Sequence, residues 1–74
     1  MNNIVFDYSK LLGKIKEKYD TQINFVKDID LSLSSLNQRL NNKIDFTTRD
    51  IKTICEKLDI NKSEIPDYFF TEKV

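Results

Sequence analysis

The chain has 74 residues, of which 12 are basic and 12 acidic, so its formal net charge is zero. A domain of this length buries only about 60% of the surface that its unfolded chain exposes, which excludes a deep catalytic cleft beside the core. A hydrophobic content of 39% excludes a disordered chain, and the balanced charge argues against a protein that coats nucleic acid without sequence preference. With one Gly and one Pro, the chain favours helix, and we expect a single all-α domain over residues 1–74.

The first predicted helix covers residues 8–19, with Asp7 as its N-cap. Its apolar residues recur at the spacing of one helical face. These residues are Tyr8, Leu11, Leu12, Ile15 and Tyr19. Gly13 interrupts this face, but its cost of about 1 kcal/mol relative to alanine is too small to end the helix.

Two short helices separated by a tight turn are predicted over about residues 21–41, which is the pattern of a helix-turn-helix. Thr21 is expected to cap the first of them. The buried face of this helix is expected to be Phe25, Val26 and Ile29. Asp30 is expected to end the helix in the left-handed conformation, which Asp tolerates better than most residues, and Ser32 to cap the second helix of about nine residues.

The second of these helices has two chemically different faces. Leu36 and Leu40 form an apolar face, with Leu33 close to it, whereas the opposite face is polar. That polar face consists of Ser34, Asn37, Gln38 and Asn41. Residues 31–44 contain no acid and have a net charge of +2. Since Asn and Gln can bind adenine bidentately and acids would repel phosphate, the face fits the DNA major groove; the alternative is an ordinary solvated surface.

The remaining elements are a connecting loop over residues 43–46, with Ile44 and Phe46 as its apolar anchors, a fourth helix and a short C-terminal turn. Thr47 or Thr48 is expected to cap the fourth helix, with Asp50 near its positive end. Its apolar stripe is Ile51, Ile54, Cys55 and Leu58. Asn61 or Ser63 is expected to start the last turn, and Pro66 suits a first helical position. An aromatic segment over residues 65–74 then contains Tyr68, Phe69 and Phe70.

No catalytic or metal site is predicted. The chain has no His and a single Cys, so neither a Cys–His pair nor a zinc cluster is possible, and it has no Gly-rich phosphate loop. We therefore expect no enzyme activity, no cofactor and no small-molecule substrate. Cys55 is expected in the core of a protein in a reducing compartment. With no apolar run of membrane-spanning length and no secretory signal at the N-terminus, a cytoplasmic protein is expected.

Taken together, these segments resemble the lambda-repressor-like, Cro/repressor-type helix-turn-helix family, and most closely its small phage Cro-like regulators of Gram-positive hosts. The matching segments are VFDYSKLLGKI, TQINFVKDIDLSLSSLNQRLNNK, DIKTICEKLDI and EIPDYFF. The resemblance implies a compact five-helix domain that binds double-stranded operator DNA, often as a homodimer. The chain departs from the family pattern at Asp30, where Gly is usual, and at Val26, where Ala is usual.

Carried onto this sequence, the resemblance implies two sets of DNA contacts. The base-reading residues would be Ser32, Leu33, Ser34, Asn37, Gln38 and Asn41. The backbone contacts would be Thr21, Gln22, Arg39 and Lys43. Leu33 has two alternative roles, contact with a thymine methyl group or closure of the core.

The alternative function is that of a protein-interaction modulator, which would bind a phage repressor rather than DNA alone. Net neutrality and a set of apolar residues near the two termini favour it. The candidate contacts are Ile4, Val5, Tyr68, Phe69 and Phe70. The three aromatic residues are also the candidates for a homodimer contact, and the alternative for them is the core, because a small domain needs large apolar side chains there.

Overall fold

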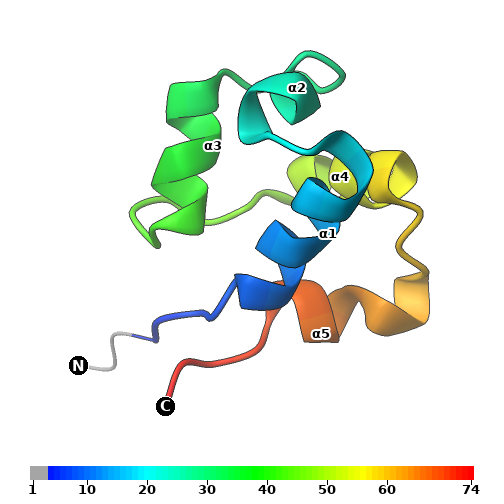
Figure 1. The fold of residues 1–74 in the computed structure, drawn as a ribbon. Helices are drawn as coiled ribbons and strands as arrows, with labels where there is room; N and C mark the ends of the chain where they lie inside the picture. The colour runs from blue at the N-terminus through cyan, green and yellow to red at the C-terminus, as the bar shows by residue number, and fades with distance from the viewer. Residues whose placement is uncertain (1–3) are drawn as a thin grey trace.

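The computed structural model describes residues 4–74, and over this range the chain is all-helical, as predicted (Figure 1). The elements are α1 (Ser9–Tyr19), α2 (Gln22–Val26), α3 (Leu33–Leu40), α4 (Thr48–Leu58), the 3-10 helix η1 (Lys62–Glu64) and α5 (Ile65–Phe69). No β-strand forms among the described residues, although an isolated antiparallel bridge joins Phe6 to Glu72 and brings the two terminal segments together.

A hydrophobic core lies between the helices and receives side chains from all five α-helices. Its buried residues are Tyr8, Leu11, Ile15, Phe25, Leu36, Ile54, Cys55, Leu58, Ile60, Tyr68 and Phe69. α1 runs through the middle of the molecule, with α2 and α3 towards one end and α5 towards the other (Figure 1). Phe46 joins the two ends of the chain, because its ring lies edge-on at 5.2 Å from both Tyr8 and Phe69. Each predicted helix therefore contributes an apolar face to the same core.

The predicted caps of α2, α3 and α4 are confirmed. The hydroxyl of Thr21 accepts a hydrogen bond from the Asn24 amide at 3.1 Å. Of the two candidates at α4, the cap is Thr47, which forms a reciprocal capping box with Asp50. Such caps each stabilise a helix by about 1 kcal/mol, because they satisfy amides that have no partner within the helix.

The start of α1 differs by one residue from the prediction. The helix begins at Ser9, so the residue at the cap position is Tyr8 rather than Asp7, and the side chain of Tyr8 makes no capping hydrogen bond. The Asp7 carboxylate still accepts from the Ser9 amide, at 2.9 Å. Asp7 therefore satisfies a backbone amide of the first turn from one residue further out.

The end of α3 is joined to the N-terminal segment by Asn42. As predicted, Asn42 is left-handed after the last turn, with φ of 62°. Its side-chain oxygen accepts from the Phe6 amide at 2.8 Å, and its side-chain nitrogen donates to the Phe6 carbonyl at 3.0 Å. These two bonds span 36 residues and hold the start of the chain against the end of α3.

The left-handed conformation predicted for Asp30 is wrong. The described non-glycine residues with positive φ are Asp20, Asn42 and Asp59. α2 ends earlier than predicted, at Val26, and the chain continues in turns in which the Asp28 amide donates to the Phe25 carbonyl at 3.0 Å. The reversal is thus spread over several residues, so it needs neither a left-handed residue nor glycine.

Two apolar residues expected inside are more exposed than predicted. Leu12 is 38% exposed, because it lies about 100° round α1 from the buried Leu11 and beyond the surface that the other helices cover. Ile44, expected to anchor the loop before α4, is 43% exposed, whereas Phe46 packs against the core.

Candidate functional site

The polar face of α3 lies at the surface of the molecule. α3 is capped by Ser32, whose hydroxyl accepts a hydrogen bond from the Ser35 amide at 3.1 Å. Leu36, whose side chain is fully buried, packs this helix against the core. Because residues three and four apart share a face, burial of Leu36 turns the predicted polar face outward. α3 lies at the edge of the molecule, where its outer side is open (Figure 1).

A shallow, open depression of about 400 Å³ runs along this face. Its lining residues are Leu33, Ser34, Asn37, Gln38, Asn41 and Lys43. The structure therefore brings together five of the six predicted base-reading residues and one of the predicted phosphate ligands. No acidic side chain is among the described residues that line it.

The side chains of this surface, called here the α3 face, differ in how free they are. Ser34, Asn37 and Gln38 are exposed, and their side chains have no hydrogen bond within the described part of the chain. Asn41 is exposed, but its amide nitrogen donates to the Asn37 carbonyl at 2.8 Å, so its oxygen is the freer group. Leu33 is half-buried and lines the depression without joining the apolar side chains packed on the core.

Ser32, Thr21 and Gln22 lie at helix starts rather than in the depression. Ser32 uses its hydroxyl as the cap of α3 and also donates from it to the Ser35 hydroxyl at 3.1 Å. The hydroxyl of Thr21 is the cap of α2, and Gln22 is half-buried in the first turn of the same helix. The hydroxyls of Ser32 and Thr21 therefore already cap helices, and a predicted contact with DNA would have to use the same hydroxyl groups.

Arg39, one of the predicted phosphate contacts, is engaged within the chain. Its guanidinium donates to the Asp50 carboxylate from Nε at 2.8 Å and to the Ser35 carbonyl at 3.0 Å. The side chains of Arg39 and Asp50 are both only 14% exposed. Arg39 therefore holds α3 to the start of α4, and sequence spacing had no signal for this pair because its members lie 11 residues apart on different helices.

Asp50 is the acceptor at the centre of this contact. Burial by itself raises the pKa of Asp50, but hydrogen bonds from the Thr47 amide and from Arg39 outweigh it and hold the pKa below its ordinary value. The carboxylate thus stays ionised and neutralises Arg39. Lys43 remains as the one cation among the described residues that line the α3 face.

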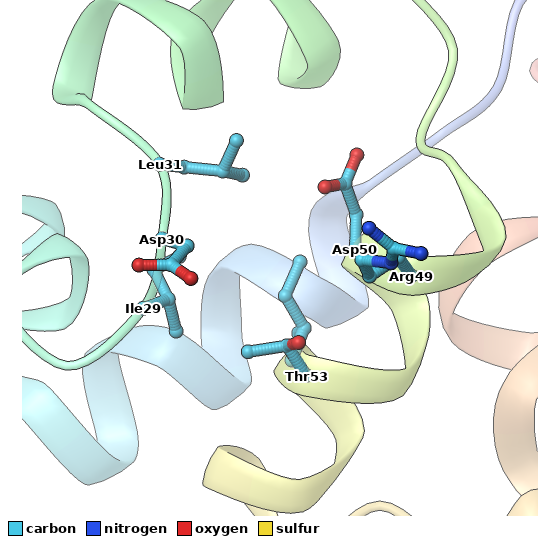
Figure 2. Close-up of a pocket in the computed structure, with 7 residues that line it drawn as sticks. Ile29, Asp30, Leu31, Arg49, Asp50 and Thr53 are labelled. Carbon is cyan, nitrogen blue, oxygen red and sulfur yellow. The ribbon is translucent and has the colours of Figure 1, made fainter.

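A small hollow of about 140 Å³ lies beside this contact, between the α2–α3 connection and α4 (Figure 2). Ile29, Asp30 and Leu31 line one side of it, and residues of α4 that include Arg49 and Thr53 line the other (Figure 2). Its two acids and one base come from both walls. Ile29 and Leu31 also pack against the core, so the hollow is a gap between two segments that pack on the same core.

The C-terminal aromatic residues are divided between the core and the surface. Tyr68 is 6% exposed and Phe69 is 2% exposed, so of the two alternatives for these residues the structure shows the core and not a partner contact. The ring of Tyr68 also lies under the ammonium group of Lys10, 4.7 Å from its centroid. Phe70 is 52% exposed and remains available, together with Ile4 and Val5.

Within the described residues, no group of three or more His, Cys, Asp or Glu is placed to hold a metal ion. None of the helices formed by residues 4–74 has the length and apolar character needed to cross a membrane. Burial raises the pKa of the Cys55 thiol, whose side chain is part of the core, as predicted.

Comparison with known proteins assigns the chain to a family. Residues 4–72 match the model of a family described as "Protein of unknown function (DUF739)". The chain belongs to that family. It is also similar to the modulator of repression (MOR) of the temperate bacteriophage TP901-1 from Lactococcus lactis, whose solution structure shares 42% sequence identity and a TM-score of 0.78. The match covers 88% of each chain. A comparison with curated proteins finds no match.

Proposed function

We propose that this DUF739 chain is a phage regulatory protein that modulates repression by binding a repressor protein. The similarity to the TP901-1 modulator of repression carries the proposal, because 42% identity over 88% of both chains is a close relation for a domain of this size. Such a protein would act in the cytoplasm of the bacterial host. No catalytic step is required of it.

The electrostatics of the α3 face support a protein partner over DNA. Phosphate contacts by Lys and Arg supply most of the affinity of a DNA-binding protein. Arg39 is neutralised by Asp50, and Lys43 is the one cation left among the described residues that line the face. With zero net charge over the whole chain, electrostatic attraction to DNA is weak.

The test is a titration of the purified chain against the purified repressor of the same phage, first without DNA and then with a labelled promoter fragment. We expect calorimetry to detect a complex with the repressor alone, and the chain alone to leave the fragment unshifted at physiological salt. An unshifted fragment together with no heat of binding to the repressor would refute the proposal.

A second candidate function is sequence-specific reading of operator DNA, as the resemblance to lambda-repressor-like, Cro-like regulators implies. The specific observation that favours it is the exposed, acid-free α3 face, with Asn37 and Gln38 side by side on its outer side. In this case the chain would bind as a homodimer to a two-fold-related site. Base-edge contacts from Asn and Gln would supply specificity, and Lys43 would bind phosphate.

For this second candidate, replacing Gln38 and Asn37 together by alanine should weaken operator binding by about 1–3 kcal/mol for each bidentate pair that is removed, because adenine edges would then have no partner. Gel shifts on operator and scrambled DNA measure the loss of affinity. Lys43→Ala is the control: it should weaken binding to both DNAs alike and lower the salt dependence by about one ion. Unchanged operator affinity in the double variant would remove these two residues from base reading.

A further inference from the structure

A second surface, distinct from the α3 face, has the shape and chemistry of a protein-docking site. Two neighbouring hollows share the residue Ile51 of α4. The first, of about 280 Å³, lies between the terminal segments and α4 and is lined by aromatic residues that include Phe6, Phe46 and Phe70. The second, of about 600 Å³, lies between α4 and the η1–α5 segment. The two hollows meet at Ile51, and the pair is called here the Ile51 groove.

The Ile51 groove is apolar along its floor. Ile51 and Ile65 are half-buried, and Cys55 and Ile60 form the bottom of the larger hollow. At the other end Phe70 is 52% exposed, beside the half-buried Phe6, with the two ring centroids 6.2 Å apart. Apolar and aromatic side chains are typical of the core of a protein–protein interface, and a DNA phosphate backbone would gain nothing from them.

The rim of the larger hollow carries charged side chains that form no ion pair among the described residues. Lys52, Glu56 and Lys62 are exposed at this rim, and none of them takes part in an ion pair formed within the described residues. Their net charge is +1, and the acid that lines the groove at its other end is Asp45, in the smaller hollow. The positive charge of the groove is therefore confined to the larger hollow. A partner with apolar side chains for the floor and an acidic side chain for the two lysines would be complementary to it.

A second copy of this chain does not meet that description. A two-fold dimer places the same patch of each copy against the other. Both hollows of the Ile51 groove are concave, so two copies facing each other would leave the hollows unfilled. The groove instead fits a protruding element of a different protein, and an amphipathic helix laid along a groove is a common way to fill such a surface.

We propose that the Ile51 groove is the repressor-docking surface, and that it binds an apolar helix whose acidic side chains lie against Lys52 and Lys62. This inference rests on the proposed function, since it names the part of the molecule that the repressor contacts. On this proposal the Ile51 groove and the α3 face have different roles, because a partner bound at α4 and α5 leaves the α3 face uncovered.

The test compares two charge-reversal variants of the full chain. Lys52→Glu with Lys62→Glu reverses the rim, whereas Lys16→Glu with Lys27→Glu makes the same change of charge at exposed positions outside the groove. Calorimetric titration with the purified phage repressor should show about tenfold or greater weakening for the rim variant and at most about twofold for the control. All four positions are exposed, so unfolding in urea should show both variants folded.

A second pair tests the floor of the groove. Ile51→Asn should weaken repressor binding about tenfold, and the matched Ile23→Asn, at a position that is 56% exposed on α2, should leave it unchanged.

Equal weakening by the rim and control charge variants would overturn the assignment of the groove. A wild-type complex that neither groove variant affects would overturn it as well. The proposed function would survive both results. A homodimer in sedimentation equilibrium that the rim variant dissociates would overturn it too, because a second copy would then occupy the groove. No binding of wild-type chain to repressor would end both proposals.

Discussion

Replacing Phe69 by alanine should lower the free energy of unfolding by about 3–5 kcal/mol, the usual cost of removing a buried phenyl ring from a core. Phe69 is 2% exposed and packs edge-on against Phe46 with ring centroids 5.2 Å apart. Domains have roughly 0.05–0.15 kcal/mol of stability per residue, so this loss is comparable with the total stability of a chain of 74 residues. Urea unfolding followed by circular dichroism measures the change.

The neighbouring residue provides the matched control. Phe70→Ala removes the same ring from a position that is 52% exposed, and it should change the free energy of unfolding by less than about 1 kcal/mol. The opposite order of effects, with Phe70 more important than Phe69, would mean that Phe69 is not a core residue. If Phe70→Ala weakens repressor binding while the chain stays folded, the exposed ring belongs to the docking surface.

Replacing Arg39 by alanine should lower the free energy of unfolding by about 2–4 kcal/mol, because it leaves a mostly buried carboxylate without its cation. Arg39 and Asp50 are joined at 2.8 Å with 14% of each side chain exposed, so solvent screens the pair only partly. The matched control is Lys43→Ala, which removes the same charge from an exposed position and should change stability by less than about 0.5 kcal/mol. Equal effects of the two variants would show that the Arg39–Asp50 contact does not stabilise the fold.

The same contact gives a signature in acid. The pKa of Asp50 is lower in the folded chain than its ordinary value of 3.8, so the folded state favours the ionised form. Its contribution to stability is therefore fully present above pH 3.8 and is lost as the pH falls through the lower, folded-state pKa. Arg39→Ala removes one cause of the low pKa, so unfolding curves of this variant should lose less stability over that acid range than those of the wild type.

Local patterns in the sequence predicted most of the secondary structure. Helical stripes, caps and left-handed helix ends depend on residues within about four positions along the chain. The structure contains the predicted first helix up to Tyr19, although Leu12 of its stripe is exposed. It also contains the caps Thr21, Ser32 and Thr47 and the left-handed Asn42. The same local reasoning predicted that Ser34, Asn37, Gln38 and Asn41 share the outer side of α3, which the depression along that helix brings together.

Contacts between distant segments were decided only by the tertiary structure. Arg39 was predicted to contact the DNA backbone, and only the fold brings it to Asp50 at the start of α4. Phe69 and Phe70 had the same predicted role, and only the fold buries one ring and exposes the other. The Ile51 groove likewise needs α4, the terminal segments and α5 to lie together. Helix periodicity and capping depend on neighbours along the chain, so sequence alone determines them well. Burial and ion pairing depend on which surfaces meet in space, and no local spacing records that.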